Sequence, residues 1–241
     1  MLVGNTQGTL AMTQPGYKQF CPLAMAAEVL CTRWTMVLIR EFIAGSTRFN
    51  DLRRGVPKMS PSLLSQRLKE LEESGVIKRK ILQSERGVFE YQLTEAGREL
   101  GAVVEALGIW GQKWIGSAES LENLDPSLLM WDMRRNLNPT PLPNKRTVIQ
   151  FLFSDLPASK SHWWLVVESG GEVDLCWSDP GFEINLYVTT DLRTMTSIWM
   201  GLTSVDKERG RLKLSGPQGI IKSMQTWLGL SPFATVRKQV A

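Results

Sequence analysis

The sequence predicts a mainly α-helical first half and an α+β second half. Apolar residues recur at helical spacing before about residue 120 and alternate with polar ones, as in strands, after about residue 145. Between these regions, Pro139, Pro141 and Pro143 interrupt both helix and central strand. A length of 241 residues also suits two domains of about 100 residues each.

The composition shifts give the expected boundaries. We expect, in order, a disordered polar tail (1–16), a helical domain (17–118), a helix with a proline-rich linker (119–144), an α+β domain (145–233) and a second tail (234–241).

Composition also narrows the function classes. The chain has no apolar run of the roughly 18–20 residues that span a bilayer, and residues 1–16 lack the features of a secretory signal. Its three cysteines are far apart and odd in number, which excludes a disulfide framework and fits a cytoplasmic protein. We expect no membrane association.

Catalytic and metal chemistry is disfavoured. A single histidine, His162, and the absence of a C-x-x-C pair exclude the usual zinc sites. No G-x-S-x-G motif accompanies His162, which we interpret as structural or exposed. We therefore expect no enzyme, no metal and no cofactor.

The elements of the first half follow from spacing and capping signals. Ser60 and Pro61 are an N-cap and a first helical residue, and Leu64, Leu68 and Leu71 give the following helix one apolar side. The expected elements are helices Leu23–Ile43, Arg48–Arg54 and Pro61–Ser74, strands Val76–Leu82 and Val88–Leu93, and helix Glu95–Ser117.

This order of elements is that of a winged helix-turn-helix. The helix Pro61–Ser74 has a polar side that fits a major groove about 12 Å wide, where serine, glutamine and arginine read base edges. Residues 48–80 also hold nine basic residues against four acidic ones. This excess of positive charge would attract a polyanion such as DNA, although an ordinary solvated surface can carry the same excess. The candidate DNA-binding residues are Arg48, Lys58, Ser60, Ser62, Ser65, Gln66, Arg67, Lys69 and Arg86. Because helix-turn-helix units also bind proteins, the pattern alone leaves that role open.

Six motifs in order resemble the HxlR family of transcriptional regulators. They are Cys21–Ala24, Arg33–Thr35, Leu38–Glu41, Arg48–Arg54, Ser60–Gly75 and Phe89–Gly97. The resemblance covers about residues 17–118 and implies a MarR-like, dimeric DNA-binding domain. It implies pairing through Pro22–Phe42 and Leu100–Ile115; the latter carries an apolar stripe of Leu100, Val103, Val104, Leu107 and Trp114. The wing tip, Ser84–Gly87, lacks the prolines of many relatives.

Cys21 has two interpretations. Some relatives sense oxidants through a cysteine at this position, and the following helix start and nearby Lys18 favour a thiolate. Alternatively, Cys21 and Pro22 only begin a helix that packs in a dimer. Cys31 and Cys176 are expected to be small core residues.

The second half predicts an antiparallel sheet covered by helices. Ser169–Gly171 is a hairpin turn between two strands. The expected elements are helix Pro126–Arg135, strands at 149–153, 163–168, 173–177, 184–188 and 211–214, and helices that begin at Asp191 and Pro217.

Short motifs in this half resemble the sterol carrier protein 2 fold. They are Val173–Trp177, Phe182–Thr190, Asp191–Gly201 and Gly210–Gly216. The resemblance implies a hydrophobic tunnel for lipid-like ligands between the sheet and the helices, although large aromatics can equally fill a core. The candidate ligand-binding residues are Phe151, Phe153, Trp163, Trp177, Leu186, Val188, Ile198, Trp199 and Trp227.

Together these features predict a cytoplasmic, homodimeric transcriptional regulator of a double-stranded DNA operator, modulated by a small hydrophobic effector. One alternative is a redox or electrophile sensor that uses Cys21, with a purely structural second domain. Another is a lipid carrier or scaffold that does not bind DNA. An enzyme acting on an apolar substrate is disfavoured because no catalytic constellation accompanies the fold.

Overall fold

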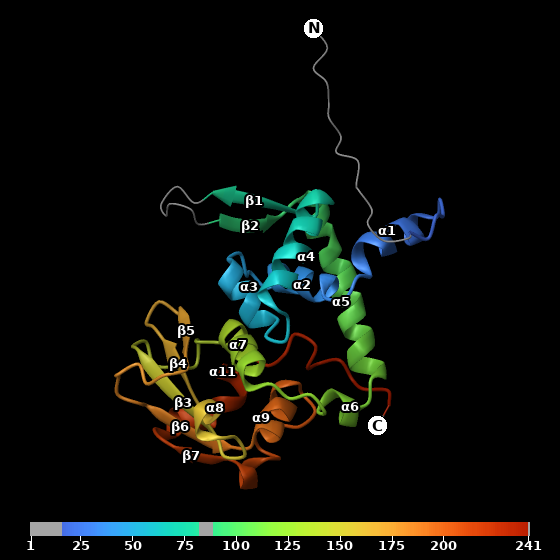
Figure 1. Ribbon diagram of the computed structural model, residues 1–241. Helices are drawn as coiled ribbons and strands as arrows, with labels where there is room; N and C mark the ends of the chain where they lie inside the picture. Colours follow the sequence, from blue (N-terminus) through green and yellow to red (C-terminus); the bar gives the residue numbers. More distant parts are fainter. Residues whose placement is uncertain (1–15, 82–88, 241) are drawn as a thin grey trace. The chain divides into compact units, whose positions relative to one another are not determined.

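The computed structural model describes residues 16–81 and 89–240 (Figure 1). The chain forms two compact units that divide between Ala106 and Leu107, inside a helix. The tail expected at 1–16 and the wing tip with Arg86 lie outside the described residues, apart from Gly16.

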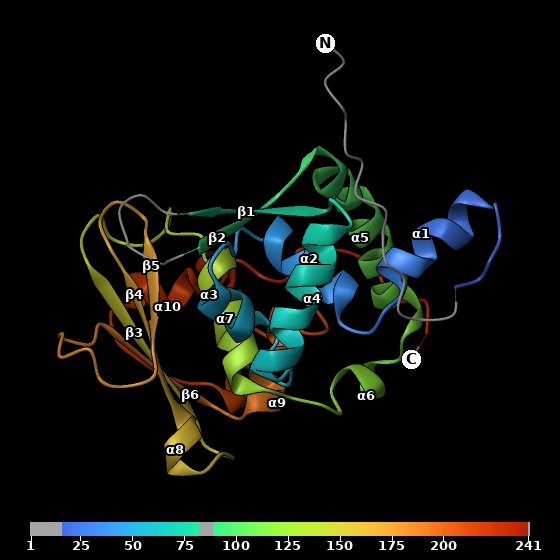
Figure 2. The ribbon, with the colours of Figure 1, turned by 45° about the horizontal axis from the view of Figure 1, so that its top comes forward.

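The first unit has the expected helix-turn-helix and hairpin (Figure 1 and Figure 2). Its strands β1 and β2 pair antiparallel from Ile77 opposite Leu93 to Ile81 opposite Phe89. The elements are α1 (Pro22–Leu30), α2 (Thr35–Ile43), α3 (Phe49–Gly55), α4 (Pro61–Glu73), β1 (Ile77–Ile81), β2 (Phe89–Leu93) and α5 (Glu95–Trp114), which continues into the second unit.

The single helix predicted over Leu23–Ile43 is wrong. The segment forms two helices, α1 and α2, bent by 81° at a break. Trp34 adopts a left-handed backbone conformation (φ 80°), which ends helical geometry, and the Thr35 amide bonds the Thr32 carbonyl across the turn. The bend lets α2 bury Leu38, Ile39 and Phe42 in the core, whereas none of the nine residues of α1, all described, is buried.

The core of the first unit lies between α2, α3, α4 and the hairpin. Leu64, Leu68 and Leu71 of α4 are buried, as predicted. The other buried apolar members of this cluster are Leu38, Ile39, Phe42, Leu52, Val56, Met59, Val76 and Ile77.

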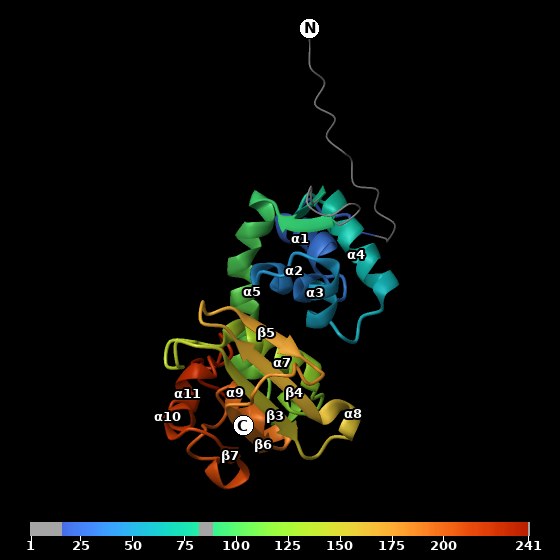
Figure 3. The same cartoon turned by 90° about the vertical axis from the view of Figure 1, so that its left-hand side faces the viewer.

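The second unit contains a five-stranded sheet in the order β5-β4-β3-β6-β7 among its described residues (Figure 3). Its strands are β3 (Thr147–Phe153), β4 (His162–Val167), β5 (Val173–Cys176), β6 (Leu186–Thr190) and β7 (Lys213–Ser215). Its helices are α6 (Ser117–Ser120), α7 (Pro126–Asn136), α8 (Ala158–Ser161), α9 (Leu192–Trp199), the 3₁₀ turn η1 (Arg209–Arg211), α10 (Gln218–Lys222) and α11 (Met224–Trp227).

The purely antiparallel sheet predicted from sequence is wrong, because β3 and β6 pair in parallel. The hairpin β4–β5 extends the sheet on one side of β3, and the chain returns to pair on the other side. Asn185 fixes this return with two hydrogen bonds to Val148. Its side-chain oxygen accepts from the Val148 backbone amide at 2.8 Å, and its backbone amide donates to the Val148 carbonyl at 2.9 Å.

Several predicted element bounds also change. The helix expected over Glu95–Ser117 ends at Trp114. The strand expected at 211–214 is β7, preceded by η1, and the last helix divides at Ser223 into α10 and α11. No described single helix is long and apolar enough to cross a membrane; α1 and α2 pass that test of length and composition only as a bent pair.

The C-terminal strap, residues 231–240, packs along the end of α5 within the second unit. The Lys238 ammonium donates to the Gln112 carbonyl at 3.3 Å and the Ile115 carbonyl at 2.5 Å, two carbonyls at the helix end that lack helical partners. The Gln239 amide bonds the Lys113 carbonyl at 2.9 Å. The Phe233 ring lies where a side chain on Gly108 would be. The strap is therefore paired with α5 through backbone and side-chain contacts.

The contact between Phe233 and Gly108 predicts the effect of Gly108→Ala. A methyl carbon there would lie 2.2 Å from the Phe233 ring, so the ring must leave and the Gln239 amide should lose protection from hydrogen exchange. Gly111→Ala is the matched control on the same helix, because its nearest neighbour would be the Ile115 side chain at 3.7 Å. Exchange measured by NMR or mass spectrometry checks this, and equal protection in both variants would contradict it.

Candidate nucleic-acid interface

Helix α4 begins and is oriented as its sequence predicts. The Ser60 hydroxyl accepts from the Leu63 amide at 3.3 Å, and Pro61 occupies the first turn. Its three buried leucines place one side of the helix in the core. The opposite side is therefore available to a partner.

The exposed side of α4 carries short polar groups and one lysine. The Ser65 hydroxyl donates to the Pro61 carbonyl at 3.0 Å, and the Ser60 and Ser62 hydroxyls lie 3.1 Å apart. Gln66 donates to Glu70 at 2.9 Å, and Lys69 lies 3.6 Å from Glu73. All four contacts are local, so the serines and Lys69 can exchange theirs for groups of a ligand at little cost to the fold.

Arg67 is placed differently from the other predicted site residues on α4. Its side chain is only 12% exposed and forms an ion pair with Glu70. Its Nε donates to the Arg33 carbonyl at 3.3 Å, in the turn between α1 and α2. The structure thus gives Arg67 contacts within the protein, whereas the sequence pattern places it with the groups available to DNA.

The other predicted residues flank α4. Arg48 is exposed at the N-cap of α3, and Lys58 and Ser60 are exposed in the turn before α4. On β1, Lys78, Arg79 and Lys80 are also exposed. These last three belong to the basic run at 48–80 but are not among the predicted site residues. Their position in a strand directly after α4 is the signal that could have included them.

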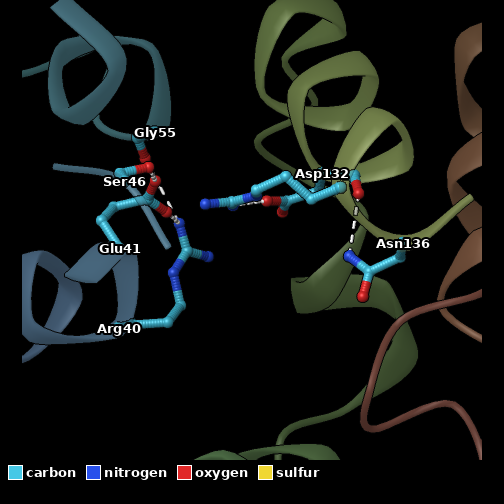
Figure 4. Close-up of polar contacts among 7 residues, drawn as sticks. Arg40, Glu41, Ser46, Gly55, Asp132 and Asn136 are labelled. Atoms are coloured by element: carbon cyan, nitrogen blue, oxygen red, sulfur yellow. Dashed lines mark hydrogen bonds and ion pairs between the residues drawn. The ribbon is translucent and has the colours of Figure 1, made fainter. Parts of the chain in front are cut away.

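A buried carboxylate holds the helices beneath this surface together (Figure 4). Glu41 of α2 is completely buried, pairs with Arg40 and accepts from the Ser46 hydroxyl at 3.3 Å. Arg40 also donates to the Gly55 carbonyl at 3.3 Å, at the end of α3. This polar cluster fixes the end of α3 against α2. The apolar periodicity did not predict the burial of Glu41, which occupies a core position between Leu38 and Phe42.

Cys21 is the exposed N-cap residue of α1. Backbone hydrogen bonds from Ala24 and Leu23 lower the pKa of its thiol below the ordinary value, because amides at a helix start stabilise a thiolate. Cys31 is exposed too, and Cys176 is half-buried, so neither is the fully buried core residue expected. Burial raises the pKa of the Cys176 thiol.

The aromatic candidates of the second unit contribute mainly to its core. Phe151, Phe153 and Trp227 are completely buried, and Trp177, the exception, is exposed. The cluster between sheet and helices also contains Trp163, Leu186, Val188 and Ile198, with Trp199 packed against it. His162 is exposed, and its Nδ1 lies 2.9 Å from the Ser161 hydroxyl. The tunnel implied by the sterol carrier resemblance remains a prediction.

Comparison with known proteins shows to which family the first unit is related. The family model described as HxlR-like helix-turn-helix matches residues 29–119. The HTH-type transcriptional regulator YvaP of Bacillus subtilis is 33% identical over 112 residues, which is 46% of this chain and 95% of YvaP. This chain belongs to the HxlR-like helix-turn-helix family. It is thus a helix-turn-helix transcriptional regulator by membership, as the resemblance implied.

Further relatives align over similar shares of the chain. YdeP of B. subtilis is 34% identical over 102 residues, 42% of this chain and 80% of YdeP. Among solved structures, the redox regulator HypR in its oxidized form is 34% identical, covering 38% of this chain and 95% of HypR with a TM-score of 0.36. The family match ends at residue 119, so most of the second unit lies outside it.

The Glu41 cluster predicts that Gly55→Ala destabilises the first unit. A methyl carbon at Gly55 would lie 1.9 Å from the Glu41 carboxyl carbon, so the buried carboxylate must move and lose its partners. Breaking such a buried pair costs about 3 kcal/mol. Urea unfolding of this variant checks the value, with Gly101→Ala in α5 as a control that meets nothing within 4 Å. Equal stabilities for the two variants would show that the close approach is unimportant.

Proposed function

We propose that this chain is a homodimeric transcriptional regulator that binds a double-stranded DNA operator through α4. The single observation that carries the proposal is the division of α4 into a buried leucine side and an exposed side of serine, glutamine and lysine. Side chains of these types donate to and accept from base edges in the major groove. Family membership supports the same function.

Basic side chains that precede and follow α4 in the sequence supply the attraction to phosphate. Arg48 and Lys58 precede the helix, and Lys78 and Lys80 follow it on β1; all four are exposed. Such contacts release counterions, so the affinity for DNA falls as salt rises. These residues position the protein on the duplex, whereas the exposed side of α4 reads sequence.

Exposed apolar side chains on α1 and α5 support dimerisation. Val103, Leu107, Trp110 and Trp114 of α5 are 47–56% exposed, at a spacing of four, three and four residues that places them on one side of the helix. Leu100 and Val104, which the predicted stripe included, instead pack against the core of the first unit. Leu23 of α1 is also exposed. A two-fold dimer would bind a palindromic operator with half-sites about one helical turn apart.

We further propose that the second unit binds a small hydrophobic effector or contributes to the dimer. The candidate residues other than Trp177 belong to the packed layer between the sheet and the helices, so an apolar ligand would enter by separating them. An effector regulates only if it binds the DNA-competent and incompetent states with different affinities. Native mass spectrometry of the purified chain tests this, because a co-purified ligand adds a fixed mass and its absence from every preparation would argue against it.

A charged substitution on α5 should separate the chains. Leu107→Glu is expected to give a monomer and to lower affinity for a selected operator at least tenfold, because a carboxylate replaces an apolar contact and only one α4 then engages the site. Native mass spectrometry with operator DNA should report two chains per duplex for the unaltered protein. Glu105→Gln, also exposed on α5, is the control. A monomeric unaltered chain, or a chain that protects no sequence, would refute the proposal.

Redox sensing through Cys21 is the second candidate function, favoured by its exposure and by the lowered pKa of its thiol. The thiolate forms at lower pH than for an ordinary cysteine, so alkylation of Cys21 should begin at a lower pH than alkylation of free cysteine in the same buffer. If Cys21 senses oxidant, diamide releases operator from the unaltered chain and from Cys31→Ser but not from Cys21→Ser. Equal release from all three would remove this candidate.

A further inference from the structure

Three polar side chains of α4 form one connected network. The Glu70 carboxylate accepts from the Gln66 amide nitrogen at 2.9 Å with one oxygen and pairs with Arg67 through the other. Arg67 in turn donates from Nε to the Arg33 carbonyl at 3.3 Å. The network therefore runs from the turn between α1 and α2 to Gln66, on the exposed side of α4.

Arg67 is an anchor in this network. A guanidinium recognises a guanine through two parallel donors that must both be free and exposed. In Arg67, Nε and one terminal nitrogen already have partners in the first unit, and the side chain is 12% exposed. Reading a base through two donors would require breaking at least one of these contacts and exposing a largely buried side chain, so we assign Arg67 to holding the helix.

Glu70 fixes which atoms Gln66 presents. An ionised carboxylate only accepts hydrogen bonds, so the amide nitrogen of Gln66 must face it. The carbonyl oxygen and the second N–H of the amide remain for a partner. In the major groove, adenine offers a donor at N6 and an acceptor at N7, which match that acceptor and donor.

We propose that Arg67 and Glu70 are positioning residues that hold the Gln66 amide for adenine, with the orientation set from the turn between α1 and α2. This inference rests on operator binding by α4. It assigns sequence discrimination at one operator position to Gln66 and assigns to Arg67 a role that the charge of the residue alone would not suggest. The α1–α2 turn also carries the left-handed Trp34, so the backbone that holds Arg67 is itself fixed in an uncommon conformation.

Selection of binding sequences from a random duplex library, with the full chain, tests the proposal. Gln66→Ala identifies the operator position that Gln66 reads, and the unaltered chain should prefer adenine there by about tenfold. Arg67→Ala and Glu70→Ala should flatten the preference at that same position, with the salt dependence of binding unchanged. Glu73→Ala removes an exposed carboxylate of the same helix that lies outside this network, so it is the matched control and should keep the preference.

Conservative variants and stability measurements separate positioning from folding. Arg67→Lys keeps the charge but lacks the planar fork, so it should flatten the same position as Arg67→Ala. Thermal unfolding of each variant identifies any general loss of fold, which would lower affinity for all sequences alike and leave the base preference intact. Glu70 is 41% exposed, so Glu70→Ala provides a test that does not depend on Arg67 variants folding.

The outcomes distinguish this inference from operator binding itself. A reduction of the salt slope by about one in Arg67→Ala would make Arg67 a phosphate contact and overturn the inference. If Arg67→Ala instead lost base preference at a different operator position, Arg67 would itself be a base contact, and the inference would again be overturned. An unaltered preference in Glu70→Ala would also overturn it. If the unaltered chain enriches no sequence, the operator proposal fails and this inference fails with it.

Discussion

The burial of one side of α4 is the constraint on which the surface of the first unit depends. Leu64, Leu68 and Leu71 are removed from water, and each contributes about 2 kcal/mol when fully buried. Rotating the helix about its axis would expose them and bury serine, glutamine and lysine without partners. The polar side therefore has one orientation, and the basic residues before and after α4 are placed relative to it.

In the first unit, a buried charged cluster joins α2 to α3, where apolar side chains more often make such contacts. The Glu41 carboxylate has no access to water, and its partners come from its own helix, from the following loop and through Arg40 from the end of α3. A buried charge is stable only when such partners surround it, so the cluster tolerates few geometries. The helix-turn-helix therefore has an apolar core, whose packing can adjust, and a polar cluster around Glu41, whose geometry is fixed by its hydrogen bonds.

Local signals made much of the first unit predictable. The cap at Ser60, the proline at position 61 and the three leucines of α4 act within one or two turns of helix, so sequence spacing contains them. The break at Trp34 was missed because apolar spacing continues through it and tryptophan carries no signal for a left-handed conformation. The candidate site residues were predicted by residue type, but the contact that anchors Arg67 is with Arg33, which is 34 positions away.

The parallel pairing of β3 and β6 depends on Asn185 meeting Val148 across 37 positions, a non-local contact that periodicity cannot encode. The C-terminal strap is likewise held by contacts between residues distant in the sequence. Lys238 and Gln239 bond to the end of α5, the helix that carries the exposed Trp110 and Trp114. Tryptophan fluorescence from this helix would therefore respond to release of the strap as well as to a partner that covers the same side chains.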